Sequence, residues 1–540
     1  MFKNKMSFLL TTIFFSAVFF AVQIFGQTFA PTATITVHSN ADAGGTCPGA
    51  TCTLRQAIAT AAAGDTIDFD MTMVTSPITL ASEIAVNKHL TIYGPGANVL
   101  TISGNNAVRV FNITSGNVTL SGLTIANGNA PDGTGLTGGG GILNSSIGTV
   151  TISNCTISGN KATFGYGGGV QNNSTTGTLN ITGSTINSNS ATYDSNTGNG
   201  GSGGGIFNNS GVLNVTNSTI YGNVAPNSGG GIYNGFSGTL NVTNCTLNGN
   251  NAGQGGGIIN NNTANVKNSI IAGNIGNVGQ DADGAFNSQG YNLIGISDPN
   301  YTIGFTNGIN NDQVGSPAAP IDPRLGPLQY NGGTTQTMAL LAGSPAIDKG
   351  SAANNPATGQ PIITDQRGFT RPVDNPSIPN APGGDGSDIG AFEVQRGGTP
   401  TYLAFSVQPS NTPPGQTIMP AVQVQILDAA GNLTNSNANV TIAIGNNPSG
   451  GTLSGTTTVA AAGGTATFSN LSINQPGNGY TLIASSVGLT SATSNPFNIA
   501  PLPDLTITKT HMGNFQQGQR NAQYTITVSN INPTATSGTV

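Results

Sequence analysis

Apolar and polar residues alternate in six short segments of the chain, and the six segments repeat one pattern. The segments are residues 118–125, 150–157, 179–186, 213–220, 240–247 and 264–271. In residues 240–247, Leu240 and Val242 alternate with asparagine and threonine. A period of two sends successive side chains to opposite faces of a strand. Each segment therefore predicts a short strand with one buried face and one solvated face.

A second unit lies between these segments, a run of glycines that ends in one β-branched residue. These residues are Ile142, Val170, Ile206, Ile232 and Ile258, spaced 28, 36, 26 and 26 residues apart. Repeats of this length are typical of stacked solenoids, and the Val/Ile/Thr-rich runs indicate strands rather than helices. We predict an all-β parallel β-helix over residues 32–310, with the glycines at corners that need positive φ. A propeller, the main alternative, would need about 40 residues per blade and aromatic signatures.

Stacking such coils places like residues above one another in columns. One column is apolar and consists of Ile125, Ile157, Ile186, Ile220, Leu247 and Ile271. Three residues further along lies a polar column, which consists of Asn160, Asn189, Asn223, Asn250 and Asn274. We expect the first to form a buried spine, and the amides of the second to bond to one another or to turn backbone.

The N-terminal region predicts export and a cap on the first coil. Lys3 and Lys5 precede the apolar stretch 8–24, which predicts a signal peptide over residues 1–26, with an uncleaved membrane anchor as the alternative. No other segment is apolar enough to span a bilayer, so no membrane span is expected after cleavage. Residues 53–63 predict one helix, with Thr53 and Gln56 as a capping box and Gly64 as its stop. We expect this helix to cover the open end of the solenoid.

Four cysteines divide into two pairs by their positions. Cys47 and Cys52 close a short loop, and in an exported protein we expect them to form a disulfide. Cys155 and Cys245 fall in one column, three coils apart, which corresponds to roughly 14 Å at about 4.8 Å per strand step. A disulfide needs Cα atoms within about 7 Å. These two cysteines should therefore be free, and the same distance excludes a metal site between them.

Charge is scarce along the whole chain of 540 residues. Charged side chains make up 6% of it, against roughly 25% in ordinary soluble proteins, and the net charge is −6. This composition indicates a neutral surface solvated by Asn, Ser and Thr, and it argues against nucleic acid as a partner.

Three parts of the chain carry a family resemblance. Residues 52–58 read Cys-Thr-Leu-Arg-Gln-Ala-Ile, which resembles the Cys-Ser-Leu-Arg-Glu-Ala-Ile signature of secreted bacterial right-handed β-helix proteins of the pectin-lyase-like fold. The Gly-Gly-Gly-Ile repeats are similar to those of polymorphic outer-membrane-protein passengers. Residues 311–396, through Asp322-Pro-Arg-Leu-Gly-Pro327 and Asp388-Ile-Gly-Ala-Phe-Glu393, resemble a "choice-of-anchor" module. The resemblance implies a secreted, cell-surface or outer-membrane-associated protein and identifies no catalytic residue.

Most acidic and basic residues near the end of the repeats cluster in that module. They are Asp348, Asp365, Arg367, Arg371, Asp385, Asp388 and Glu393. We interpret them as a buried Asp/Arg network that locks an irregular C-terminal cap. The alternative is a structural calcium site with ligands from Asp385 and Asp388. Otherwise no cofactor and no metal is expected.

The tail predicts β-sandwich modules. Longer strand patterns over residues 400–499 favour an immunoglobulin-like sandwich without its disulfide, and it resembles the bacterial Ig-like modules of surface proteins. Residues 500–503 read as a stiff linker. Residues 504–540 resemble the opening strands of a repeated bacterial extracellular module, which we expect to be incomplete.

These features favour a binding protein over an enzyme. Glycoside hydrolysis needs two carboxylates in one cleft, yet residues 118–280 contain only Asp132, Lys161, Asp194 and Lys267 as charged residues. A second acidic candidate site is Asp65, Asp68, Asp70 and Glu83, which the alternation of Asp68 and Asp70 with apolar residues explains more simply as a solvated strand face. We expect a noncatalytic, adhesin-like surface protein, a monomeric rod that contacts polysaccharide or a cell-surface protein. The alternatives are a polysaccharide lyase or hydrolase and a passive stalk.

Overall fold

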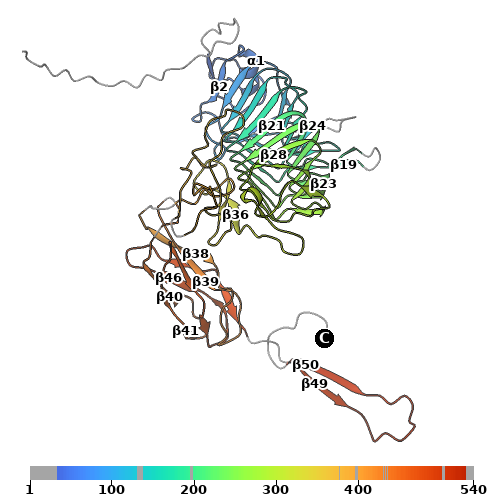
Figure 1. The fold of residues 1–540 in the computed structure, drawn as a ribbon, viewed down its shortest axis with the longest axis vertical. Coiled ribbons are helices and arrows are strands. Elements are labelled where there is room, and N and C mark those ends of the chain that lie inside the picture. Colours follow the sequence, from blue (N-terminus) through green and yellow to red (C-terminus); the bar gives the residue numbers. More distant parts are fainter. Residues whose placement is uncertain are drawn as a thin grey trace, which may run out of the picture.

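The computed structural model describes most of the chain: residues 33–130, 138–194, 199–375, 378–395, 399–429, 431, 433–434, 436–500 and 505–530. The predicted signal peptide, residues 501–503 of the predicted linker, residue 504 and residues 531–540 lie outside this part. The parallel β-helix is confirmed (Figure 1), and antiparallel sandwich sheets follow it along the chain. Among the described residues no helix is long and apolar enough to cross a membrane.

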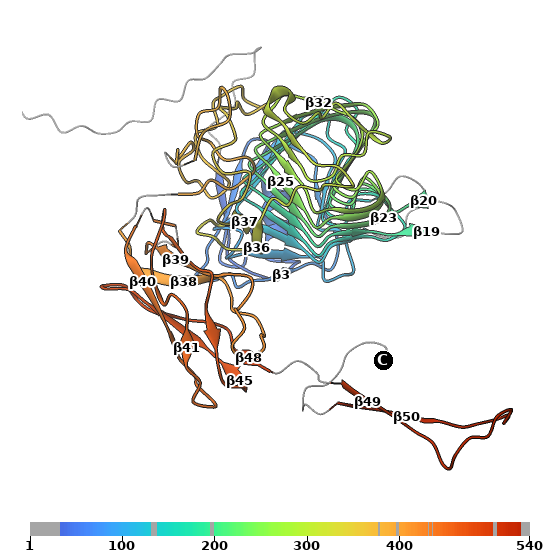
Figure 2. The same cartoon turned by 60° about the horizontal axis from the view of Figure 1, so that its bottom comes forward.

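Each coil of the β-helix contributes strands to up to four faces, which Figure 2 shows nearly end-on. Face 1 consists of β4 (Ile84–Val86), β7 (Phe111–Ile113), β11 (Ile142–Asn144), β15 (Val170–Asn172), the first part of β21 (Ile206–Thr216), the first part of β24 (Ile232–Thr243), β27 (Ile258–Asn260), β31 (Ala282–Ala285) and β34 (Thr302–Ile303). Face 2 consists of β1 (Thr34–Val37), β2 (Thr66–Phe69), β5 (Leu90–Tyr93), β8 (Val118–Ser121), β12 (Thr149–Ser153), β16 (Thr178–Thr182), the ends of β21 and β24, β28 (Thr263–Lys267) and β32 (Asn287–Ser288). Because β21 and β24 continue round the corner, faces 1 and 2 form one sheet.

The other two faces are separate parallel sheets. Face 3 consists of β3 (Ile78–Thr79), β6 (Thr101–Ser103), β9 (Thr124–Ala126), β13 (Thr156–Ser158), β17 (Thr185–Asn187), β22 (Thr219–Tyr221), β25 (Thr246–Asn248), β29 (Ile270–Ile271), β33 (Leu293–Ile294) and β35 (Gln313–Val314). Face 4 consists of β10 (Asn129–Ala130), β14 (Lys161–Ala162), β18 (Ser190–Ala191), β23 (Val224–Ser228), β26 (Asn251–Gln254) and β30 (Ile275–Val278). Since β35 still pairs with β33, the last coil extends past the boundary predicted at residue 310.

The structure superimposes the columns read from the sequence. On face 3, Ile157 pairs with Ile125 and Ile186, and the same register continues through Ile220, Leu247 and Ile271. All six side chains are fully buried. The column extends at both ends, to Ile102 and to Ile294. Burying such a column contributes about 1.5–3 kcal/mol per side chain.

The asparagine column forms a ladder, the corner ladder, at the corner between faces 3 and 4. Each side-chain amide donates to the next carbonyl oxygen, from Asn160 through Asn189, Asn223 and Asn250 to Asn274, over 2.8–2.9 Å. Each oxygen also accepts the backbone N–H of the preceding asparagine. A buried polar group costs little only when it is hydrogen-bonded in this way.

The glycines of each run that ends in Ile or Val play two roles, because only one glycine in the run takes positive φ. In residues 203–205 only Gly203 takes positive φ, at 68°. A Cβ on Gly204 would lie 2.6 Å from backbone atoms of Val224, and one on Gly205 would lie 2.6 Å from the carbonyl oxygen of Gly231. The expectation that whole runs serve the corners was therefore only partly right: the second and third glycines let neighbouring coils approach closely.

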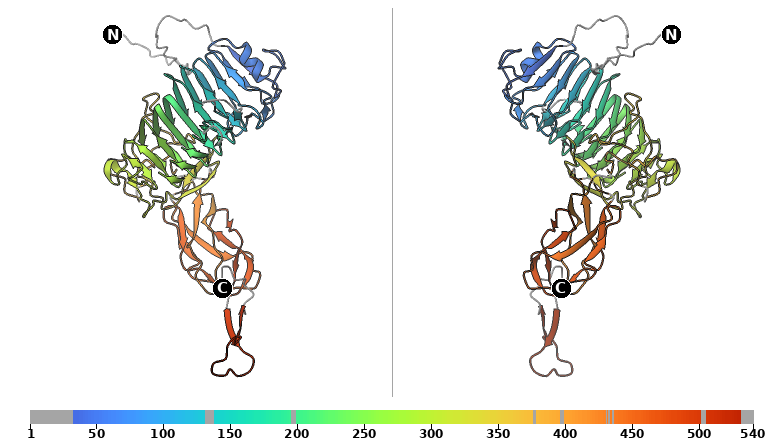
Figure 3. Two further views of the ribbon diagram at one scale, coloured as in Figure 1. Left: turned by 90° about the vertical axis from the view of Figure 1, so that its right-hand side faces the viewer. Right: turned by 90° about the vertical axis from the view of Figure 1, so that its left-hand side faces the viewer.

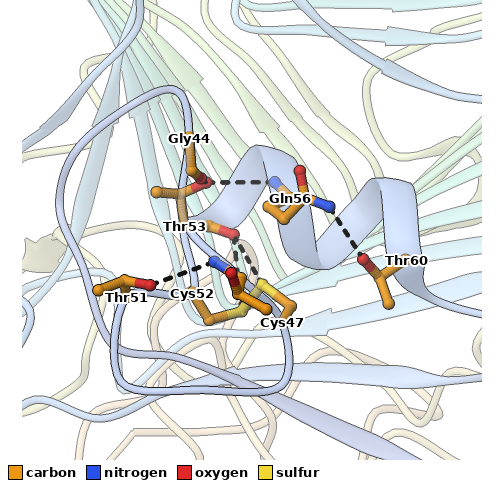
Figure 4. The surroundings of a disulfide bond; sticks show 8 residues. Gly44, Cys47, Thr51, Cys52, Thr53, Gln56 and Thr60 are labelled. Carbon is orange, nitrogen blue, oxygen red and sulfur yellow. Dashed lines mark hydrogen bonds between the residues drawn. A yellow bond between two sulfur atoms is a disulfide. The ribbon is translucent and has the colours of Figure 1, made fainter.

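A short helix covers the first coil, and a disulfide ties the loop before it (Figure 4). Helix α1 spans Leu54–Thr60 and ends at Ala61, so the prediction that it continues to residue 63 and stops at Gly64 is wrong. The Thr53 hydroxyl accepts the N–H of Gln56, but the Gln56 side chain bonds to Thr60, so only half of the capping box forms.

The cysteines pair as expected. Cys47 and Cys52 form a disulfide with Cα atoms 4.7 Å apart. Cys155 and Cys245 are free and buried, and burial raises the pKa of each thiol to about 12.

After the last coil, residues 322–375 and 378–394, here called the lateral segment, lie along the outside of face 3. This segment includes the hairpin β36 (Leu325–Gln329) and β37 (Thr337–Leu340), and Figure 3 shows its yellow strands beside the green coils. The Gln366 side chain bonds to Thr185 and Thr219, and Asn268 bonds to Ser351. The sequence predicted a C-terminal cap, which would cover the end of the solenoid. The lateral segment instead covers its side.

An antiparallel sandwich with its own core follows. Its strands are β38 (Tyr402–Val407), β39 (Val422–Leu427), β40 (Asn439–Ile444), β41 (Leu453–Ser454), β42 (Thr458–Ala460), β43 (Thr465–Phe468), β44 (Ser472–Ile473), β45 (Gly477–Tyr480), β46 (Leu482–Ser485), β47 (Ala492–Thr493) and β48 (Phe497–Ile499). The pairings fit an immunoglobulin-like module. Beyond it, β49 (Leu505–Thr510) and β50 (Thr525–Asn530) form one hairpin.

Candidate functional site

A groove lined by aromatic rings lies at the corner between faces 1 and 2. Its lining consists of Tyr166, Thr175, Phe207, Asn209, Ser210, Tyr233, Gly235, Phe236 and Ser237, and its volume is about 520 Å³. The residues come from three successive coils, because Phe207 pairs with Tyr233 across β21 and β24. Exposed apolar surface rimmed by polar groups is typical of a binding site on a soluble protein.

Three of the rings contact one another along the solenoid, one pair stacked and the other tilted. The ring centroids of Phe207 and Tyr233 lie 4.6 Å apart and are nearly parallel, and Tyr166 lies 4.7 Å from Phe207. Phe207 is buried, and Tyr233 is half-buried. Burial, and then the nearby Tyr166, raise the pKa of Tyr233, whose side chain bonds to Asn261. The Tyr233 ring is therefore neutral at ordinary pH.

The fourth ring differs because it projects into solvent. Phe236 is 78% exposed, and it lies in the turn of β24 between faces 1 and 2. Asn209, Ser210 and Ser237 supply amide and hydroxyl groups around it. A flat apolar ring beside uncharged donors and acceptors can hold a ligand that has both an apolar face and hydroxyl groups.

This groove was not predicted from the sequence. Its signal is present in the repeat, because aromatic residues directly follow the glycine-run isoleucines at Phe207 and Tyr233. The same unit ends in an asparagine in every copy. These asparagines, Asn144, Asn172, Asn208, Asn234 and Asn260, form a second buried ladder with amide bonds of 2.7–2.8 Å.

The acidic cluster of the lateral segment forms a network of ion pairs. Arg367 pairs with Asp365 at 2.7 Å, and Arg371 pairs with Glu393 at 2.8 Å, with all four side chains buried. Asp388 accepts the backbone N–H groups of Asp348 and Val394. Burial, and then the neighbouring charge of Glu393, raise the pKa of Asp388 well above its usual value.

This geometry favours the structural interpretation over calcium. Asp385 accepts the backbone N–H of Ser387. Both oxygens of Asp388 already accept backbone N–H groups. Among the residues that the structure describes, no three His, Cys, Asp or Glu side chains are grouped closely enough to hold a metal ion.

Three of the four N-terminal acids are held by separate partners. Asp65 accepts the N–H groups of Ala33 and Ala62, and Asp70 accepts the backbone N–H of Thr72. Glu83 pairs with Arg109 at 2.5 Å. Asp68, on β2, has a buried carboxylate oxygen without a partner. Asp132 lies outside the described residues, as does the side chain of Asp194.

Arg55 serves the N-terminal cap. Its guanidinium pairs with Asp42 at 2.8 Å and donates to the carbonyl oxygens of Ser82 and Glu83. It therefore ties the loop before α1 to the first coils.

No protein-family model matches the chain, and no curated protein is similar to it at a significant level.

Proposed function

We propose that the protein is an exported, noncatalytic surface protein that presents its β-helix for contact with polysaccharide. The resemblance of residues 52–58 and of the glycine repeats to secreted bacterial β-helix proteins supports a surface location. The single observation that carries the binding role is the exposed ring of Phe236 in a groove of stacked aromatics, amides and hydroxyls.

Sugars match this groove chemically. A pyranose ring has an apolar C–H face, which can lie on an aromatic ring, and an equatorial rim of hydroxyls, which can bond to Asn209, Ser210 and Ser237. The described lining contains no carboxylate, imidazole or amine. Glycoside hydrolysis uses a pair of carboxylates, so the lining supports retention of a glycan rather than its hydrolysis.

The rigidity of the scaffold supports the same role. The side chains of the groove lie on neighbouring coils that are held in fixed register by β21 and β24. A preorganised surface loses little conformational entropy when it binds, and several weak contacts along one polymer add to the overall affinity.

A glycan array with the full-length protein tests this proposal. We expect saturable binding to a subset of glycans, and we expect Phe236→Ala to weaken it about tenfold or more, as loss of a central aromatic anchor does. Ile147→Ala is the matched control, because Ile147 is an exposed apolar residue at the same corner of an earlier coil. Absence of saturable binding would leave a passive stalk, and shortened glycans would indicate an enzyme.

A further inference from the structure

A second depression lies on face 2, at the edge next to the lateral segment. It is lined by Asn241, Thr243, Asn265, Lys267, Gln289, Ala352, Asn354 and Pro356. Amide and hydroxyl groups dominate this lining, and Lys267 is its one charged side chain. The depression is therefore polar and carries a single positive charge.

Lys267 departs from the repeat pattern at its position. The residues above it in the same column of face 2 are Ser153, Thr182, Thr216 and Thr243. All four are small hydroxyl residues, so neither the core nor the strand register explains a lysine here. In the described part of the chain, the five ion pairs involve other residues, so the Lys267 ammonium has no carboxylate within 4 Å.

Strand β24 connects this depression to the aromatic groove. It carries Phe236 and Ser237 at the corner and continues along face 2 with Thr239, Asn241 and Thr243. Thr239 and Asn241 are half-exposed. The five residue steps from Gly238 to Thr243 span roughly 16 Å at about 3.3 Å per residue. Figure 1 shows β24 beside β28, the strand that carries Lys267.

The surface between the two ends is held in place by an outer ladder of amides. Asn214, Asn241 and Asn265 bond to one another through their side chains at 2.7–2.8 Å. Asn241 and Asn265 are half-exposed, whereas Asn214 is buried, so the remaining donors and acceptors of Asn241 and Asn265 face solvent. They offer fixed, uncharged hydrogen-bonding groups along the path from Phe236 to Lys267.

We propose that the outer side of β24 is one elongated site for an acidic oligosaccharide. A neutral sugar ring lies on Phe236, the chain crosses the outer ladder, and a sugar carboxylate pairs with Lys267. This inference rests on the proposed function and deepens it by naming the class of glycan. Charge complementarity selects the ligand, because an unpaired ammonium among amides favours a carboxylate over a hydroxyl at that end.

The test compares two oligosaccharides that differ only in charge. One is a hexasaccharide of alternating glucuronate and N-acetylglucosamine, and the other is the same molecule with its carboxylates reduced to alcohols. With the full-length protein, we expect the charged hexasaccharide to bind about fivefold more tightly in calorimetry, as a partly exposed ion pair would give.

Variants assign that preference to its residue. Lys267→Gln should abolish the preference and leave binding of the reduced hexasaccharide unchanged, whereas Lys267→Arg should retain it. Phe236→Ala should weaken both ligands equally. Lys161→Gln, at an exposed lysine on face 4, is the matched control and should change neither affinity. Unaltered melting temperatures will show that each variant is folded.

The outcomes separate this inference from the proposed function. Equal binding of the two hexasaccharides by the unmodified protein, or a preference that persists in Lys267→Gln, overturns the acidic site while glycan binding stands. If neither hexasaccharide binds but the glycan array still shows saturable binding to other glycans, only the acidic site is overturned. If the array also shows no binding, both the acidic site and the proposed function are overturned.

Discussion

At the scale of single residues, a carboxylate ends each of two buried hydrogen-bond chains. Asp281 accepts the backbone N–H and the amide of Asn274 at the end of the corner ladder. Asp312 accepts the backbone N–H and the side-chain amide of Asn292. The side-chain oxygen of Asn292 in turn accepts the backbone N–H of Ser269. The final donors need acceptors, and a carboxylate offers two oxygens without adding a donor that would itself need a partner.

Asp281 predicts a pH dependence of stability. Burial raises its pKa to about 6, above the ordinary value of about 3.9 in an unfolded chain. The folded state therefore binds more protons between these values, so stability is greatest below about pH 4 and falls as pH rises towards 6. The difference corresponds to about 2–3 kcal/mol.

Calorimetric unfolding between pH 4 and 7 measures this effect. Asp281→Asn removes the titrating group, keeps an oxygen for Asn274, and should flatten that part of the stability profile. Asp388 and Glu393 also have raised pKa values, so the difference between the two proteins isolates Asp281. Parallel profiles for the unmodified protein and the variant would show that Asp281 does not titrate in this range.

Asn223 tests how much the corner ladder contributes. In Asn223→Ala, Asn189 loses the acceptor of both its N–H and its amide, and both asparagines are fully buried. Each unsatisfied buried group costs about 1–3 kcal/mol, so we expect a loss of roughly 2–5 kcal/mol of unfolding free energy. Asn241→Ala in the half-exposed outer ladder is the control, where water can replace the amide and less than about 1 kcal/mol should be lost.

At the scale of elements, the glycine runs set how closely coils stack. Gly204→Ala would place a methyl group 2.6 Å from the Val224 backbone, whereas a Cβ on Gly222 meets nothing within 4 Å. Gly222 has φ of 63°, so Gly222→Ala costs about 1–2 kcal/mol for its left-handed backbone. We expect Gly204→Ala to cost clearly more, and thermal melting of the two variants compares them. Equal losses would mean that the coils can separate freely.

The sequence predicts those elements whose determinants lie within one repeat. The spine through Ile157 and the corner ladder through Asn189 follow from a fixed period and from the alternation along each strand. The free state of Cys155 follows from the coil spacing alone. Each of these properties needs only the identity of a residue and the number of coils between copies.

The remaining features depend on contacts between distant parts of the chain. Nothing in the pattern of residues 322–394 places Gln366 against Thr185 and Thr219, because an irregular segment has no period that fixes its direction. The end of α1 at Thr60 is similar: the helix stops before Gly64 because the chain turns to enter β2, and local capping residues do not determine that turn. The groove needs rings from three coils to meet, which a single repeat does not show.

At the scale of the whole molecule, the scarcity of charged residues predicts that salt affects binding of a charged ligand more than it affects folding stability. The most buried ion pairs, Arg367–Asp365 and Arg371–Glu393, lie within the lateral segment, and salt screens buried pairs much less than exposed ones. With 6% charged residues, few surface interactions remain to be screened. We expect the melting temperature to change by less than about 2 °C between about 20 and 500 mM NaCl.

Binding of the charged hexasaccharide should weaken severalfold over the same range, because Lys267 is partly exposed and its ion pair is screened. Binding of the reduced hexasaccharide provides the uncharged reference. A large shift in melting temperature would indicate that surface charge stabilises the rod, and salt-independent binding of the charged ligand would remove Lys267 from the site.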